Sequence, residues 1–207
     1  MVAYETRLQS DRRWALSEGS RHFEERSAVQ ETLHQLTRRL AELNIPYAVS
    51  GAMALFHHGL RRFTEDIDLL VTREALTSIH EQLSGLGYLP STPGGKNLRD
   101  TRTGVRIDFI VTGDYPGDGR VKPVAFPDPA TVALEFDGVR YLNLATLIEL
   151  KLASGMTNPA RLRDLSDVLE LIRLLKLPAE FADQHLNPYV REKFREFAAI
   201  AATVADE

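Results

Sequence analysis

The spacing of apolar side chains divides the first part of the chain into short elements. Between residues 27 and 43, apolar residues follow one another at intervals of three and four, which predicts an amphipathic helix. The apolar run at residues 47–49 predicts a short strand. A short helix is expected over residues 52–58, closed by Gly59, because glycine adopts the left-handed conformation of a helix end at little cost.

Two later segments have the composition of strands. Residues 66–71 and 106–111 are rich in branched apolar side chains, and acidic side chains interrupt both of them. Between these strands we expect a helix over residues 73–86. A loop is expected over residues 89–96, which contain the prolines and glycines typical of turns.

After the second strand the pattern changes from sheet to helix. A long loop is predicted over residues 113–129, and its length points to a function, because long ordered loops often cover sites. Asp137 and Gly138, between two alternating runs in residues 131–142, predict a hairpin. Helices are expected over residues 144–154, 160–175, 178–185 and 188–204.

Together these elements predict an α+β fold. A small mixed β-sheet with flanking helices is expected in residues 1–143, and a C-terminal helical bundle packed on it in residues 144–207. The charged stretch around Trp14 is expected to form an N-terminal helix that lies on the domain.

The composition excludes several classes of protein. The chain has 207 residues, 43% of them hydrophobic, and a formal net charge of -4 from 25 basic and 29 acidic side chains. These values exclude a disordered chain, and the absence of cysteine excludes disulfide frameworks and thiolate metal sites. No window is apolar enough to span a bilayer and no signal peptide is visible, so we expect a cytoplasmic location and no membrane partner. The mild acidity disfavours binding of nucleic acid through overall charge.

Two carboxylates alternate on the first of the predicted long strands. Asp66 and Asp68 are two residues apart, so in a strand their side chains lie on the same face. Like charges at this spacing repel each other unless a cation lies between them. Magnesium is suited to such a site, because it takes one or two carboxylates and completes its shell with water and phosphate oxygens. The alternative is an exposed strand face that carries two acids without a metal.

A third carboxylate lies in the second long strand. Asp108 shares a strand face with Arg106, and sequential strands are often neighbours in a sheet. If they are neighbours here, Asp108 completes a cluster of three acids, which favours two metal ions about 3.5 to 4 Å apart. The alternative is a salt bridge between Asp108 and Arg106 or another arginine.

Residues with phosphate-binding chemistry flank this cluster. Ser50 and Gly51 lie where a strand turns into a helix, and a small residue with glycine lets the backbone approach a phosphate. Arg62 and Thr64 precede the acidic strand, where they can reach a triphosphate or an acceptor, or lie in solvent.

The helical half contains a lysine on an apolar helix face. Lys151 shares the face of Leu147 and Ile148, where an uncompensated ammonium group is costly. It therefore needs an acidic or phosphate partner, unless its stem packs while its head reaches solvent. Asp164 borders the buried face of the next predicted helix, where it can orient Lys151 or Arg163.

In combination these residues resemble a known pattern. Ser50 and Gly51, the segment at residues 59–71, and Asp108 resemble the minimal nucleotidyltransferases of the polymerase-β superfamily. Their pattern is an apolar residue, Gly, Gly or Ser, a spacer, Asp-x-Asp or Asp-x-Glu, and a third acid one strand later. The resemblance covers about residues 45–175.

The helical half is similar to the abortive-infection toxin (AbiEii-like) branch of that superfamily. The similarity lies in residues 144–152 and 161–167. The chain departs from the usual motifs at Ser50, which replaces the first glycine, and at Arg163, which precedes the acid where the branch commonly has lysine. The spacer before Asp66 is also long for the family.

The resemblance implies an activity and a set of roles. A nucleoside monophosphate would pass from an NTP to an acceptor hydroxyl on RNA, protein or a small molecule, with release of pyrophosphate. Two Mg²⁺ ions, for which Mn²⁺ could substitute, would act as cofactors, and an antitoxin protein would be a possible partner. The implied catalytic and metal-binding residues are Asp66, Asp68 and Asp108, and the implied nucleotide-binding residues are Ser50, Gly51, Arg62, Thr64, Lys151, Arg163 and Asp164.

Two other functions fit parts of the pattern. In glycosyltransferases an Asp-x-Asp motif binds the metal of a nucleotide sugar, but several strands normally precede the motif and only one candidate strand does so here. A catalytically silent domain of the same fold could bind a nucleotide or a partner protein. The retention of three mutually repelling carboxylates argues against such a silent domain.

Overall fold

A single mixed β-sheet forms the centre of the molecule. The computed structural model describes residues 2–204. The strands are β1 (Tyr47–Val49), β2 (Asp66–Val71), β3 (Tyr88–Pro90), β4 (Asn97–Asp100), β5 (Arg106–Val111), β6 (Ala133–Phe136) and β7 (Val139–Leu142). They form a seven-stranded sheet in the order β3-β4-β5-β2-β1-β7-β6, in which β2–β5 and β1–β7 are parallel pairs and the other pairs are antiparallel. The predicted α+β fold is therefore confirmed.

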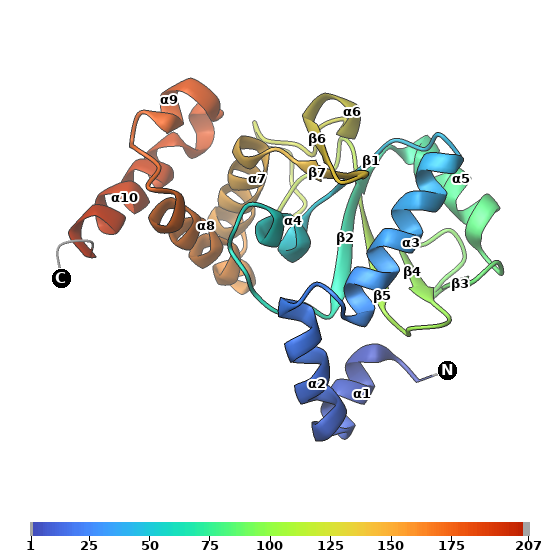
Figure 1. The fold of residues 1–207 in the computed structure, drawn as a ribbon. Coiled ribbons are helices and arrows are strands. Elements are labelled where there is room, and N and C mark those ends of the chain that lie inside the picture. Colours follow the sequence, from blue (N-terminus) through green and yellow to red (C-terminus); the bar gives the residue numbers. More distant parts are fainter. Residues whose placement is uncertain (1, 205–207) are drawn as a thin grey trace.

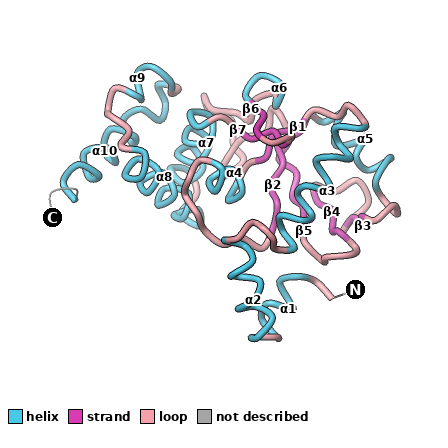
Figure 2. The backbone as a smooth tube through the Cα atoms, viewed as in Figure 1, coloured by secondary structure: helices cyan, strands magenta, loops and turns pink. Residues whose placement is uncertain are grey.

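Helices lie on both sides of this sheet. They are α1 (Tyr4–Ser10), α2 (Arg12–Phe23), α3 (Ala28–Glu42), α4 (Gly51–His57), α5 (Arg73–Leu83), α6 (Pro129–Val132), α7 (Leu144–Thr157), the 3-10 turn η1 (Pro159–Arg161), α8 (Leu162–Leu175), α9 (Phe181–His185) and α10 (Pro188–Val204). Figure 1 shows α3 and α5 on one side of the strands and α7, α8, α9 and α10 on the other, with α1 and α2 at one end. The magenta strands in Figure 2 are enclosed between these two groups of helices.

Alternation along the two central parallel strands sorts their side chains between the faces. Ile67, Leu69 and Ile107 are fully buried in the core that α3 and α5 form with the sheet. The parallel register places Asp68 beside Asp108. Because successive side chains alternate, the acidic side chains lie on the opposite face, toward the C-terminal helices.

A second core covers that opposite face. Leu70 of β2 is buried with Leu55 of α4, Ile148 of α7, Val168 of α8 and Phe194 of α10. Helices α7 and α8 are thus fixed against the sheet by apolar contacts from several elements. This packing holds the polar side chains of α7 and α8 near the acidic residues of the strands.

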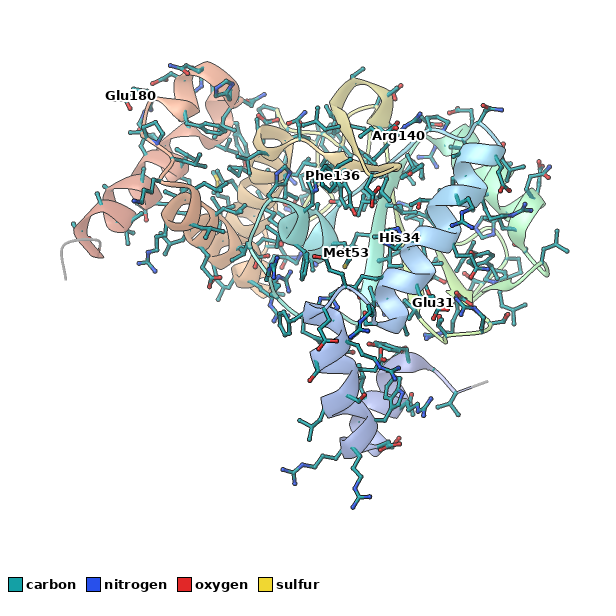
Figure 3. The ribbon with its side chains drawn as sticks, in the orientation of Figure 1. Glu31, His34, Met53, Phe136, Arg140 and Glu180 are labelled. Carbon is teal, nitrogen blue, oxygen red and sulfur yellow. The ribbon has the colours of Figure 1, made fainter. Side chains whose placement is uncertain are left out.

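Local signals explain where several elements begin. Helix α3 starts where predicted because Ser27 accepts from the backbone N–H of Gln30, whose side chain accepts in turn from the backbone of Ser27. The predicted hairpin is β6–β7, which places Asp137 and Gly138 at the turn with positive φ angles of 49° and 74°. Phe136, labelled on this hairpin in Figure 3, is largely exposed.

Several predicted boundaries are wrong. The segment expected as a loop at residues 89–96 is interrupted, because Leu89 and Pro90 belong to β3, and the neighbouring strand β4 was not predicted. Both strands are very short. Strand β4 pairs with β5 and β3 pairs with β4, so their formation depends on cross-strand partners rather than on an alternating pattern of their own. Helix α5 ends at Leu83, three residues before the expected end, because Ser84 takes an extended conformation. The charged stretch around Trp14 forms α2 as predicted, and a further helix, α1, precedes it.

The remaining expectations for the helical half hold with small shifts. Helix α7 continues three residues beyond its predicted end, and α9 begins at Phe181 rather than at residue 178. In residues 2–204 no helix is both long enough and apolar enough to cross a membrane.

The first core generates a stability prediction. Leu36 of α3 is fully buried, so Leu36→Ala is expected to reduce the free energy of unfolding by about 2 to 5 kcal/mol through lost burial and the remaining cavity. The nearby Arg38 is exposed, and Arg38→Ala should change the free energy of unfolding by less than about 0.5 kcal/mol. Urea denaturation of both variants checks this, and equal midpoints would contradict the assigned role of α3.

Candidate active site

A cleft of about 750 Å³ lies between the acidic face of the sheet and helices α7 and α8. Strands, the turn before α4, and two helices of the C-terminal half contribute to its lining. All the site residues predicted from the sequence line it: Ser50, Gly51, Arg62, Thr64, Asp66, Asp68, Asp108, Lys151, Arg163 and Asp164. The fold therefore brings together residues that are up to about a hundred positions apart in the chain.

The three carboxylates form one acidic edge of this cleft. Asp68 and Asp108 are direct neighbours across the parallel β2–β5 pair, and Asp66 lies opposite Arg106. The Arg106 guanidinium bridges two of the acids: Nη2 is 2.9 Å from Asp66 Oδ2, and Nε is 2.9 Å from Asp108 Oδ2. The salt bridge considered as an alternative from the sequence is thus present, and it extends to a second acid.

This arrangement differs from a preformed metal site. In the part of the chain that the structure describes, no group of three or more His, Asp or Glu side chains is arranged to hold a metal ion. The reason is visible in the contacts, since Arg106 holds the carboxylates of Asp66 and Asp108. The side chains present nevertheless fit a hard divalent cation, because carboxylate oxygens are the ligands that such a cation prefers. The guanidinium of Arg106 already places a positive charge between the carboxylates of Asp66 and Asp108.

Asp68 has the strongest electrostatic perturbation in the cleft. Burial raises the pKa of Asp68 to about 7, and repulsion from Asp66 and Asp108 adds to this effect. Burial also raises the pKa of Asp108, although the nearby Arg106 opposes the shift. Asp66 is better satisfied, because the Thr64 hydroxyl donates to its Oδ1 at 2.7 Å. A further positive charge beside Asp68 would relieve this repulsion.

The turn before α4 approaches Asp68 closely. The backbone N–H of Ser50 donates to the carbonyl oxygen of Asp68 at 2.8 Å. Gly51 has a φ of +58°, and a Cβ on it would overlap the Asp68 carboxylate. Glycine is required here both for the backbone conformation and for the space.

Opposite the acids, α7 and α8 share a buried ionic network. Lys151 Nζ donates to Asp164 Oδ1 at 2.8 Å and to Asp167 Oδ2 at 2.7 Å. Ser154 and Arg161 complete the shell of Asp164, with Ser154 Oγ 2.7 Å and Arg161 Nε 3.0 Å from its Oδ2. The acidic partner that the sequence required for Lys151 is therefore present, and the snorkelling alternative is wrong.

Asp167 is a site residue that the sequence reasoning missed. Besides Lys151, it accepts from Arg62 Nη2 at 3.2 Å, so it links the C-terminal helices to the segment before β2. It lies three residues after Asp164 and is 3% exposed, and this helical spacing beside a buried acid could have identified it. The backbone of Arg62 is supported from α2, where His22 Nε2 lies 3.0 Å from the Arg62 carbonyl oxygen.

The predicted long loop forms one wall of the cleft. Pro116, Gly117 and Phe126 from this loop line it. Asn158 Nδ2 donates to the Gly117 carbonyl oxygen at 3.1 Å, and a Cβ on Gly117 would clash with the end of α7. The loop is thus packed against α7 in the structure, as expected for a segment that covers a site.

A family model matches residues 35–206, which include the sheet, the cleft and the C-terminal helices, and its description is "Nucleotidyl transferase AbiEii toxin, Type IV TA system". The chain belongs to the AbiEii nucleotidyltransferase toxin family. It is therefore a nucleotidyltransferase, as the resemblance of its motifs implied. No curated protein sequence matches the chain.

Solved structures resemble this AbiEii-family chain in fold. ANT(2")-Ia in complex with adenylyl-2"-tobramycin has 16% sequence identity and a TM-score of 0.50, over 80% of this chain and 96% of that chain. An antigenic nucleotidyltransferase-like protein from Paracoccidioides brasiliensis has 15% identity and a TM-score of 0.49, over 84% of this chain and 87% of that chain. The first of these similarities supports a nucleotidyltransferase fold.

The turn at Gly51 generates a prediction with a matched control. Gly51→Ala is expected to displace the Asp68 carboxylate and to reduce nucleotidyl transfer at least tenfold, because Cβ and carboxylate cannot share the same space. Gly138 also has a positive φ, +74°, but nothing lies within 4 Å of its added Cβ. Gly138→Ala should therefore lose about 1 kcal/mol of stability through backbone strain and keep its activity. Thermal melts and transfer assays on both variants separate strain from displacement, and equal activities would contradict the role of Gly51.

The ionic network generates a pH prediction. Burial alone would raise the pKa of Asp164, but Lys151 and the Ser154 hydroxyl outweigh burial and hold it below its ordinary value. Because the folded pKa is lowered, this contribution to stability is complete above the pKa of unfolded aspartate, about 4, and is lost as the pH falls through the folded pKa. Asp164→Asn should cost about 3 kcal/mol at pH 7, and the difference from wild type should shrink toward pH 3.

Urea denaturation between pH 7 and pH 3 measures this difference. Asp137→Asn, at the exposed hairpin turn, is the control and should track wild type throughout. A constant difference between wild type and Asp164→Asn across the range would show that the Asp164 carboxylate does not titrate as expected.

Proposed function

We propose that this nucleotidyltransferase moves a nucleoside monophosphate from an NTP to an acceptor hydroxyl in the cleft, with a divalent metal, and that it acts as a toxin. The observation that carries the proposal is the juxtaposition of Asp66, Asp68 and Asp108 with Lys151 across one cleft. Acids on one side and cations on the other match the charges of a metal-bound triphosphate. The family membership favours this enzyme over a silent binding domain.

Asp66, Asp68 and Asp108 are the residues that would hold the metal, for which we propose Mg²⁺. Bound there, the metal would supply charge neutralisation at the attacking and leaving oxygens of phosphoryl transfer. Asp108 also lies where a carboxylate could accept the proton of an acceptor hydroxyl.

The remaining polar residues of the cleft are assigned to the nucleotide. The Ser50–Gly51 turn lines the cleft beside Asp68, where its lack of a bulky side chain leaves room for a phosphate to approach. Arg62, Lys151 and Arg163 supply positive charge for the phosphates. Hydrogen bonds to Asp164 and Asp167 position Lys151 before a substrate binds. Most of the rate enhancement would come from such positioning of charged groups.

The acceptor is an RNA, a protein or a small molecule. ANT(2")-Ia was solved with an adenylylated tobramycin, which is a small molecule. In this chain the wall at Pro116 and Phe126 adjoins β5, which carries Asp108, and would form part of the acceptor side of the cleft. An antitoxin partner is consistent with the type IV toxin-antitoxin family.

The experiment is to incubate the purified protein with each α-labelled NTP, Mg²⁺, and total RNA or cell lysate as acceptor. Label should move to one class of acceptor, and Asp66→Ala/Asp68→Ala should reduce transfer about 10³-fold or more, because charge neutralisation at the phosphates is lost. Glu170→Ala, an exposed acid of α8 outside the cleft, is the control and should transfer at the wild-type rate.

The outcomes separate the alternatives. Transfer that depends on the two aspartates identifies the acceptor class as well as the activity. Nucleotide binding without transfer to any acceptor would favour the silent domain. Equal transfer by wild type and the double variant would overturn the assignment of Asp66 and Asp68.

A further inference from the structure

Arg106 is a charged residue at the acidic edge that neither the motifs nor the proposed chemistry uses. It projects from β5 between Asp66 and Asp108 and makes a 2.9 Å contact with each. Its side chain is 45% exposed and lines the cleft, so it reaches the carboxylates from the solvent side. The strand register fixes this position, because Arg106 lies directly opposite Asp66.

The guanidinium uses the oxygen atoms that a metal would need. It takes Oδ2 of Asp66 and Oδ2 of Asp108, while Thr64 donates to the other oxygen of Asp66. Asp68 has no such cationic neighbour in direct contact within the described residues. A metal ligated by Oδ2 of Asp66 and Oδ2 of Asp108 therefore competes with Arg106 for these two atoms.

We propose that Arg106 is a counter-ion latch that closes the acidic edge in the free enzyme and is released when a metal enters together with the triphosphate of an NTP. This inference rests on the proposed function. The latch neutralises the acids, so free metal binds the resting enzyme weakly. A triphosphate offers the guanidinium another anion, since arginine binds phosphate oxygens as well as carboxylates. Metal and nucleotide consequently bind cooperatively.

The latch predicts the effect of its removal on metal affinity. Arg106→Met should bind Mn²⁺ in the absence of nucleotide about tenfold more tightly than wild type, because no ion pair has to be broken first. The same variant should have a lower melting temperature without metal and a larger rise on addition of Mn²⁺, since three acids then repel one another without a counter-ion. Arg106→Gln serves as a second variant in case the methionine variant does not fold.

The matched control is Arg99→Met. Arg99 lies on β4 opposite Arg106 in the sheet, and its replacement by methionine removes the same charge. The Arg99 side chain, however, forms its ion pair with Glu5 and not with the acidic edge. If net charge alone controlled metal affinity, both variants would bind Mn²⁺ more tightly. If the latch exists, only the Arg106 variants should show an increased affinity for Mn²⁺.

Calorimetric titration of Mn²⁺ into each folded protein, with and without a non-hydrolysable NTP analogue, is the test. A tenfold gain for the Arg106 variants that diminishes when the analogue is present supports the latch. Equal Mn²⁺ affinity in wild type and the Arg106 variants, or an equal gain in Arg99→Met, overturns the latch and leaves the proposed function intact. Failure of every protein to bind Mn²⁺, even with the analogue, overturns both the latch and the proposed metal site.

Discussion

The register of the parallel β2–β5 pair imposes the central electrostatic constraint on this protein. It places Asp68 beside Asp108 and Asp66 beside Arg106 on one face of the sheet. Burial raises the pKa of Asp68, and repulsion from the carboxylates of Asp66 and Asp108 adds to this shift. The fold stays compatible with this repulsion only by keeping positive charge nearby. The distribution of arginine and lysine around the cleft follows from that requirement.

On the other side of the cleft, the C-terminal helices also balance buried charges with partners of opposite sign. Lys151 would be a costly buried charge on its own, and α8 supplies Asp164 and Asp167 as partners. Asp167 also binds Arg62. The apolar core behind α7 and α8 therefore has two effects, because it stabilises the helical half and fixes the orientation of a charged network toward the sheet.

The sequence was sufficient for features that depend on local periodicity. The alternation of Asp66 and Asp68 with apolar neighbours placed both acids on one face, and the apolar surroundings of Lys151 correctly required an acidic partner. It was insufficient where long-range pairing decides the structure. Strand β4 pairs with the edge of β5 and β3 pairs in turn with β4, and neither has a pattern strong enough to predict a strand alone.

The contacts of the acidic edge could not be predicted from the sequence either, because they form between neighbouring strands. From the sequence, a metal cluster and a salt bridge with Arg106 were alternatives for Asp108, and only the cross-strand geometry showed one guanidinium reaching two acids. Asp167 was missed for a related reason. Its spacing of three residues from Asp164 indicated a shared helix face, but its contact with Arg62, about a hundred residues earlier, follows only from the fold.

The contact between His22 and the Arg62 backbone connects a residue that lines the cleft to an element outside the region that the family model matches. His22 lies in α2, and the family match begins only at residue 35. Its ring is buried against Phe56 and Phe63. The contact from α2 therefore supports the segment that carries Arg62 just before β2. Because the Arg62 side chain contacts Asp167 of α8, a displacement of α2 would be transmitted through this one arginine to the ionic network of the C-terminal helices.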